Sequence, residues 1–369
     1  MRRVELQIHD VAFGGKGVAR ADGKAVFVPF TIDGERVSAQ IVREKKQFAE
    51  AELGAVIEAS PERVVAPCPY FGRCGGCSYQ HISYAHQIEL KARQVEQAMR
   101  RIARLPEPPM RPMVPSPLPY AYRNRITVHV QDRVIGFYRR DVHELMDIEQ
   151  CPISMAEVNH ALAQLRATRP QEGHYSLRAH SGPRVFAQTN DAVAEAIADY
   201  IASIVGKERG VLIDAFCGAG FFARRLAPKF ERVIGIDWDR FAITAARKGA
   251  SANETYIAGD VARELAKALD IVVAGVSPAE NSTLPPDATP ATTLILDPPA
   301  TGLTAEMREV IRDHPPGTVI YVSCNPPTLA RDLAELQSRF TVLSITPFDM
   351  FPQTAEIEVV VELRRNGAL

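Results

Sequence analysis

Hydrophobic and polar residues alternate in short runs through the first sixty residues of this 369-residue chain. Glycine-rich or Asp-Gly turns, such as Asp22-Gly23 and Asp33-Gly34, separate the runs. This pattern predicts short strands joined by tight hairpins, because glycine readily adopts the positive φ that such turns need. The spacing fits a five-stranded barrel of the OB type, a fold that often binds oligonucleotides. A β-domain without that role is the alternative.

The periodicity becomes helical over residues 84–105. Apolar residues recur there every three or four positions, at Ile88, Ala92, Val95, Met99 and Ile102. This predicts an amphipathic helix whose basic residues, Lys91 among them, largely occupy the other faces. A proline-rich stretch, residues 106–120, then links the helix to further strand-like segments.

From about residue 186, apolar strands alternate with loops and amphipathic helices. This alternation predicts a doubly wound, mostly parallel α/β sheet of the Rossmann type. The expected organisation is an OB-type barrel over residues 1–57, a central α+β domain over residues 58–185 and the α/β domain over residues 186–369.

Composition excludes several classes of protein. With 46% hydrophobic and 24% charged residues, the chain is neither fibrous nor disordered. No apolar run approaches the ~20 residues of a membrane-spanning helix, and the first residues lack the apolar core of a signal peptide. We therefore expect a cytoplasmic protein that does not enter a membrane, with no obligate protein partner evident.

Charge is distributed unevenly along the chain. The formal net charge is −1, yet residues 91–140 hold 11 Lys and Arg against 3 Asp and Glu. Such a basic region is typical of a surface that binds a polyanion. A solvated helix face with scattered loop arginines would give the same count.

The α/β part contains a glycine loop, DAFCGAG, between an apolar strand and a helix. Gly218 lets backbone approach a ligand there, and Asp237 ends the next strand, where it can accept hydrogen bonds from a ribose. The loop lacks the G-x-G-x-x-G spacing of dinucleotide-binding proteins, so S-adenosylmethionine fits better than NAD. A purely structural turn is the alternative.

Reactive residue types follow two later strands. Asp297 ends the strand in LILD and Cys324 ends the strand in IYVSC, where open α/β sheets bind their ligands. Near the C-terminus, Glu356 and Glu358 would share one face if they belong to a strand. A buried structural cysteine and solvent-facing carboxylates are the alternatives.

Four further cysteines stand in a pattern typical of metal ligands. Cys68, Cys74 and Cys77 lie within ten residues, and Cys151 follows far downstream. In a reducing compartment such a set binds zinc or an iron–sulfur cluster, and the spacing alone does not separate the two. It differs from the spacing of radical S-adenosylmethionine enzymes, so any cluster is expected to be structural.

These motifs together resemble one family, the RNA uracil-5-methyltransferases that modify tRNA and 23S rRNA. The similarity covers nearly the whole chain. Residues 1–57 resemble a TRAM domain, and the later motifs are CPYFGRCGGCSYQH, YRNR, GFYRR, RVFAQTN, DAFCGAG, LDPP, SCNPPTLARD and DMFPQTAEIE. The chain departs from the family at Ala300, Gln353 and Glu356, and at Phe221 near the expected cofactor.

The resemblance implies specific roles for individual residues. It implies a [4Fe-4S] cluster on Cys68, Cys74, Cys77 and Cys151. It makes Cys324 the nucleophile and Glu358 the base. It implies that S-adenosyl-L-methionine binds to a set of six residues: Gln188, Phe216, Gly218, Asp237, Asp260 and Asp297.

The expected activity is S-adenosylmethionine-dependent methylation of a uridine at carbon 5. A TRAM domain together with a cysteine cluster is similar to the rRNA branch of the family, so the expected partner is structured RNA, first of all 23S rRNA. A tRNA substrate is the first alternative. A non-catalytic RNA-binding iron–sulfur protein is the second, and the presence of both Cys324 and Glu358 argues against it.

Overall fold

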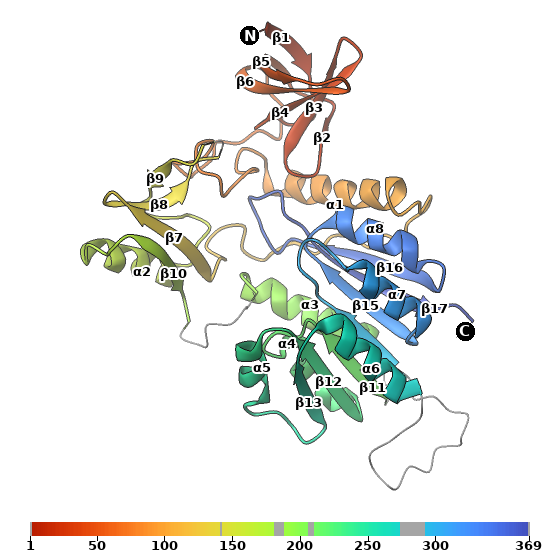
Figure 1. Ribbon diagram of the computed structural model, residues 1–369. Helices are drawn as coiled ribbons and strands as arrows, with labels where there is room; N and C mark the ends of the chain where they lie inside the picture. The colour runs from red at the N-terminus through yellow and green to blue at the C-terminus, as the bar shows by residue number, and fades with distance from the viewer. Residues whose placement is uncertain (1, 141, 181–187, 206–209, 274–291, 368–369) are drawn as a thin grey trace.

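The computed structural model of the protein describes residues 2–140, 142–180, 188–205, 210–273 and 292–367. Three β-sheets follow one another along the chain, and helix α1 (Tyr84–Arg101) lies between the first sheet and the third (Figure 1). Within these ranges, no helix is long and apolar enough to cross a membrane.

The first sheet has six strands in the order β1-β5-β6-β4-β3-β2. Strand β1 also contacts β3, which curls the sheet towards a barrel. The positive φ angles of Asp22 and Gly23 close the hairpin between β3 and β4, as the Asp-Gly pair predicts. The expected number of five strands was wrong, because the chain leaves the sheet at residues 8 and 9 and returns as a separate short strand. The strands are β1 (Arg2–Gln7), β2 (Asp10–Val11), β3 (Lys16–Ala21), β4 (Lys24–Pro29), β5 (Arg36–Glu44) and β6 (Phe48–Glu58).

Helix α1 begins where the Ser83 side chain accepts a hydrogen bond from the backbone N–H of His86. Its apolar residues pack as the periodicity predicts, except that Ile102 is exposed. Lys91, expected on a face away from the apolar stripe, is nevertheless fully buried, and its Nζ lies 2.6 Å from Oδ1 of Asp349. A partner 258 residues away leaves no trace in local periodicity.

The second sheet has the strand order β10-β7-β8-β9, and helix α2 covers one of its faces. Ile126, Val128 and Val130 on β7 pack there against Val158 and Leu162 of α2. The alternate residues of β7 therefore lie on the opposite face of the sheet. The elements are β7 (Arg125–Gln131), β8 (Val134–Tyr138), β9 (Leu145–Asp147), α2 (Ala156–Ala167) and β10 (Gly173–Arg178).

The third sheet has the order β13-β12-β11-β14-β15-β17-β16. Its first five strands are parallel and β17 is antiparallel to both neighbours, which confirms a mostly parallel α/β sheet. The strands are β11 (Val211–Ala215), β12 (Arg232–Asp237), β13 (Glu254–Ala258), β14 (Thr292–Leu296), β15 (Thr318–Ser323), β16 (Phe340–Phe348) and β17 (Glu358–Arg365).

Helices cover both faces of this sheet, as a doubly wound fold requires. One apolar core joins the sheet to α6, α7, α8 and α1, and a second core joins it to α3, α4 and α5. The helices are α3 (Asp191–Ile204), α4 (Phe221–Leu226), followed by a 3₁₀ turn (Ala227–Lys229), α5 (Arg240–Arg247), α6 (Val261–Val273), α7 (Ala305–Asp313) and α8 (Pro326–Leu336).

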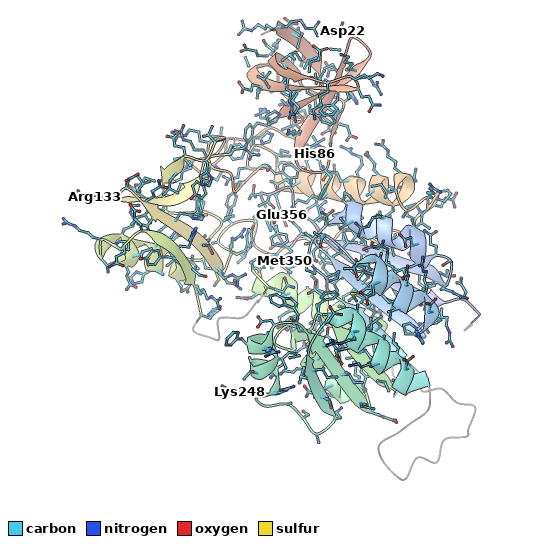
Figure 2. All side chains as sticks on the ribbon, in the orientation of Figure 1. Asp22, His86, Arg133, Lys248, Met350 and Glu356 are labelled. Atoms are coloured by element: carbon cyan, nitrogen blue, oxygen red, sulfur yellow. The ribbon has the colours of Figure 1, made fainter. Side chains whose placement is uncertain are left out.

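The segment between β16 and β17, residues 349–357, is largely buried in the middle of the molecule, where Met350 and Glu356 are labelled (Figure 2). Side chains from distant parts of the chain donate hydrogen bonds to this segment. Lys91 donates to Asp349 and Phe351, Gln87 to Gln353, Tyr122 to Pro352 and Asn190 to Met350. We call residues 349–357 the tethered segment.

We predict that Lys91→Met lowers the free energy of unfolding by ~3–5 kcal/mol, because it leaves the Asp349 carboxylate buried without its cation. Urea unfolding followed by circular dichroism measures this. Adding Asp349→Leu to Lys91→Met should restore much of the loss, since no buried charge then remains.

The matched control is Arg100→Ala on the same helix, which removes an exposed ion pair with Glu96. It should change stability by less than about 1 kcal/mol. Equal losses in Lys91→Met and Arg100→Ala would show that the buried pair does not anchor the tethered segment.

Candidate active site

The loop after β11 contains two residues in the left-handed backbone conformation, which glycine adopts most readily. Phe216 and Gly218 have φ of 69° and 53°, in the left-handed region. The N–H of Gly218 donates to one oxygen of Asp237, at 2.8 Å, and the N–H of Asp239 donates to the other, also at 2.8 Å. Asp237 is buried at the end of β12. Its carboxylate holds the glycine loop that the sequence predicted through the hydrogen bond from Gly218.

Asp214, the residue before the end of β11, is a charged member of this site that the sequence analysis did not select. It is fully buried, and its Oδ2 accepts a hydrogen bond from the N–H of Ala223. Among the described residues, its Oδ1 has no hydrogen-bond partner. Burial, followed by the charges of Asp297 and Asp237, raises the pKa of Asp214 to about 7. The sequence contained one signal for this role, an acidic residue within the apolar run GVLIDAF.

Cys324 and Glu358 stand side by side at the carboxyl edge of the sheet. Strands β15 and β17 are antiparallel neighbours in which Ser323 pairs with Val359. Cys324 follows Ser323 and Glu358 precedes Val359, so the two are opposite each other across the strand pair. Asp297 follows β14, the next strand along, at the same edge.

Burial shifts the pKa of all three groups, and neighbouring charges add to the shift at Cys324 and Glu358. Burial, together with the charges of Glu358, Asp297 and Glu356, raises the pKa of the Cys324 thiol to about 12. Burial, with Asp297 and Glu356 adding to it, raises the pKa of Glu358 well above its usual range, and burial raises that of Asp297 to about 7. These shifts favour the protonated forms of Cys324 and Glu358 at neutral pH.

The structure separates the two glutamates. Only Glu358 belongs to β17, where it is 3% exposed, whereas Glu356 lies before the strand and is exposed. The condition for a shared strand face is therefore not met, and the alternative of a solvent-facing carboxylate holds for Glu356. Glu358 is the buried member of the pair, held beside Cys324.

The last two predicted cofactor residues lie in separate loops, before α6 and before α3. Asp260 is exposed and accepts a hydrogen bond from the N–H of Arg263 at the start of α6. It follows Gly259, whose N–H donates to the carbonyl of Asp237, so it lies at the same sheet edge. Gln188 is half-buried before α3, and its carbonyl accepts a hydrogen bond from Asn124.

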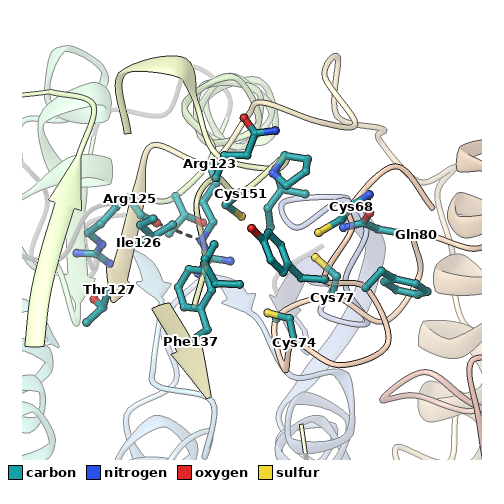
Figure 3. A pocket seen from close by; sticks show the side chains of 18 of the residues that line it. Cys68, Cys74, Cys77, Gln80, Arg123, Arg125, Ile126, Thr127, Phe137 and Cys151 are labelled. Carbon is teal, nitrogen blue, oxygen red and sulfur yellow. Dashed lines mark hydrogen bonds between the residues drawn. The ribbon is translucent and has the colours of Figure 1, made fainter. Parts of the chain in front are cut away.

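The four cysteines predicted to be metal ligands line one cavity of about 570 Å³ (Figure 3). Cys68, Cys74 and Cys77 come from the loop before α1 and Cys151 from the loop after β9. Burial, and then the charge of Cys151, raises the pKa of Cys77 to about 12. The structure thus brings together four thiols that the sequence grouped by spacing.

Within the described ranges, no three His, Cys, Asp or Glu side chains stand close enough to hold a single metal ion. The convergence of the thiols supports a shared ligand set, but neither zinc nor an iron–sulfur cluster is established by it. The metal-ligand roles of these cysteines stay predictions.

Comparison with protein families identifies the chain. The profile of the tRNA (uracil-5-)-methyltransferase family matches residues 137–366, well over half of the chain. The chain belongs to this family of uracil-5-methyltransferases. The TRAM domain profile matches residues 2–53, so the first sheet is a TRAM domain. The expected enzyme class and N-terminal domain are confirmed.

Whole-chain relatives agree with this assignment. An uncharacterised RNA methyltransferase of Gloeobacter violaceus is 28% identical, with 98% of this chain and 96% of that protein covered. One from Listeria monocytogenes is 29% identical, with 98% of each covered. The crystal structure of the Pyrococcus abyssi tRNA (uracil-54, C5)-methyltransferase in complex with S-adenosyl-L-homocysteine has the same fold, with a TM-score of 0.68 and 23% identity over 98% of this chain and 100% of that chain.

We predict that Cys324 reacts slowly with iodoacetamide at pH 7 and that its rate rises about tenfold for each pH unit towards pH 9.5, because the thiolate is the reacting form. Peptide mass spectrometry after timed alkylation measures Cys324 separately from the other cysteines. A rate that levels off below pH 9 would show that its pKa is not raised.

Proposed function

We propose that the protein methylates carbon 5 of a uridine in structured RNA, with S-adenosyl-L-methionine as methyl donor. The observation that carries this proposal is the β15–β17 register, which supports a nucleophile and a base acting on the same ring. Family membership supports the reaction, and the register supports the choice of Cys324 and Glu358.

The chemistry explains why a thiol and a carboxylate are both needed. Carbon 5 of uracil is too weak a nucleophile to take a methyl group directly. Addition of the Cys324 thiolate to carbon 6 turns carbon 5 into an enolate-like carbon. Carbon 5 then forms the new carbon–methyl bond as the sulfur–methyl bond of the donor breaks, which leaves S-adenosyl-L-homocysteine. Glu358 then takes the proton from carbon 5, and the carbon–sulfur bond breaks to release the thiolate.

The glycine loop fits an S-adenosylmethionine site. Left-handed backbone at Phe216 and Gly218 opens the loop, and buried Asp237 lies beneath it. The unpaired Oδ1 of Asp214 leaves a buried acceptor beside this loop. When bound, S-adenosylmethionine supplies an activated methyl group on a positively charged sulfur. Asp297 and Glu358 place carboxyl groups where that cation is expected, and its charge would favour their ionised forms. We assign Gln188 and Asp260 to the outer part of the same site.

The proposed RNA is 23S rRNA. This rests on the joint presence of a TRAM domain and four convergent cysteines, a combination similar to the rRNA branch of the family. The second candidate is tRNA, which the family description and the Pyrococcus abyssi enzyme both name. In either RNA the target must leave its stack, at a cost of a few kcal/mol, so a single-stranded loop is favoured.

We propose that Cys68, Cys74, Cys77 and Cys151 hold a [4Fe-4S] cluster. The chemistry of the donor set supports this, because four sulfur ligands line one cavity with no oxygen or nitrogen ligand required. With all four ligands supplied by protein, the cluster would serve to join the loop before α1 to the second sheet.

Tritium release from RNA labelled at carbon 5 of uracil tests the function. Release that depends on S-adenosylmethionine is expected with a 23S rRNA transcript, and release with unmodified tRNA instead would favour the second candidate. Cys324→Ala should abolish release while RNA binding persists. Wild-type release by Cys324→Ala would remove Cys324 as the nucleophile.

The same assay separates the two catalytic roles. Glu358→Gln should methylate carbon 5 but keep its proton, so tritium stays in the RNA and a covalent RNA–protein adduct accumulates on denaturing gels. Glu358→Gln protein that releases tritium at the wild-type rate would contradict the assignment of the base.

Protein purified without oxygen should be brown and contain about four irons per chain. Cys151→Ser should lose both colour and iron, because one ligand of the set is gone. Colourless wild-type protein with stoichiometric zinc would replace the cluster with a zinc site.

A further inference from the structure

A hairpin of the TRAM domain reaches the tethered segment. Residues 12–15 join β2 to β3, and this end of the first sheet extends towards α1 (Figure 1). Gly14 and Gly15 have φ of 93° and 85°, in the left-handed region. The N–H of Gly15 donates to the carbonyl of Ala12, at 2.9 Å, and closes the turn. We call residues 12–15 the glycine hairpin.

The surroundings of Gly15 leave no room for a side chain. A methyl group there would stand 3.0 Å from Cε1 of Tyr79, 3.1 Å from Cβ of Ser78 and 3.3 Å from Cβ of Ala355. Carbon atoms in favourable contact are ~3.5–4.0 Å apart, so all three distances are too short. Ala355 belongs to the tethered segment and precedes Glu358 closely in the chain. Glycine at this position therefore lets the first sheet touch the chain that leads to the proposed base.

A small apolar cluster joins the same parts of the molecule. Its members come from the TRAM domain, the loop before α1, α1 itself and the tethered segment. Because each part contributes only one or two side chains, none can move alone without exposing apolar surface. The first sheet and the tethered segment therefore share one packed contact. The buried members of the cluster are Val11, Ile32, Tyr79, Ile82, Leu90 and Ala355.

Hydrogen bonds through Gln94 and Tyr79 reinforce this contact. The Nε2 of Gln94, on α1, donates to the carbonyl of Val11 at 2.8 Å and to the hydroxyl of Tyr79 at 2.9 Å. The N–H of Tyr79 donates in turn to the carbonyl of Gln353, in the tethered segment, at 2.9 Å. All four residues are buried. A continuous path of hydrogen bonds thus runs from the base of the glycine hairpin to the tethered segment.

This path leads to only one of the two reacting groups of the protein. Glu358 follows directly after the tethered segment, whereas Cys324 lies between β15 and α8. A small displacement of the tethered segment would therefore move the base and leave the nucleophile in place. Displacement of a reacting group by a fraction of an ångström is enough to slow the step in which it acts.

We propose that the glycine hairpin is a positioning element for the base, because close packing at Gly15 holds the tethered segment where Glu358 can reach carbon 5. This rests on the proposed function and gives the TRAM domain a part in turnover. The step concerned is the last one. Glu358 takes the proton from carbon 5, the electron pair of that bond re-forms the ring double bond, and the carbon–sulfur bond breaks to release the Cys324 thiolate. Methyl transfer comes earlier and does not use Glu358.

Two glycine variants test the close packing. Gly15→Ala adds a methyl group against Tyr79 and Ala355, whereas Gly14→Ala adds it where no atom of the described residues lies within 4 Å. Both glycines have positive φ, so both variants carry similar backbone strain. At saturating RNA, Gly15→Ala should release tritium from carbon 5 about tenfold more slowly than Gly14→Ala, with methyl incorporation in a single turnover unchanged. The methylated covalent RNA–protein adduct should then accumulate on denaturing gels.

A second pair of variants tests the hydrogen-bonded path without adding a clash. Gln94→Met removes the bonds to Val11 and Tyr79. Gln97→Met, on the same helix, removes a bond of 3.0 Å to Asp10 of the TRAM domain and leaves Tyr79 untouched. Gln94→Met should slow tritium release and keep methyl incorporation, and Gln97→Met should do neither. Circular dichroism and amide hydrogen exchange of β5 and β6 show whether the first sheet is folded in each variant.

The outcomes separate this inference from the proposed function. Wild-type protein that releases tritium, together with Gly15→Ala protein that releases it as Gly14→Ala does, overturns the positioning role alone. A defect of Gly15→Ala that disappears at saturating RNA also overturns it, because the hairpin would then serve RNA binding. If Gly15→Ala does not fold, the comparison of Gln94→Met with Gln97→Met decides by the same criteria. Wild-type protein that releases no tritium from any RNA overturns the proposed function itself.

Discussion

The buried ion pair between Lys91 and Asp349 is the interaction on which the proposed active site depends most. Two opposite charges at 2.6 Å, both without solvent, are costly to separate, so α1 cannot leave the third sheet without exposing them or leaving one unpaired. Asp349 opens the tethered segment, and Glu358 follows directly after it. The pair therefore holds the start of the tethered segment, which leads into β17 and places Glu358 opposite Cys324.

The site collects acidic groups before any substrate binds, and their mutual repulsion opposes their ionisation. Asp214, Asp237, Asp297 and Glu358 lie at one edge of the third sheet, and burial raises the pKa of three of them. A cationic sulfonium would relieve this repulsion and favour the ionised forms. Binding of the methyl donor would thereby prepare Glu358 to accept a proton, which couples cofactor binding to the state of the base through electrostatics alone.

The second sheet stands between the other two in the chain and shares contacts with both. Tyr122, just before β7, hydrogen-bonds the tethered segment, and the loop that carries Cys77 continues to Ser78 and Tyr79, whose N–H groups both bond to the carbonyl of Gln353. The cysteine loops and the second sheet are thus connected through these contacts to the segment that leads into Glu358.

The sequence by itself determined the order of the sheets and the glycine loop with Asp237, because periodicity and motif spacing are local properties. Its motifs also grouped the four cysteines and, through the family resemblance, indicated Cys324 and Glu358. It counted five strands in the first sheet and left open whether Glu356 faces solvent. Only the tertiary structure decided which charges are buried, Lys91 among them, and that Asp214 belongs to the site. Burial and cross-strand pairing depend on residues far apart in the chain, and no local pattern encodes them.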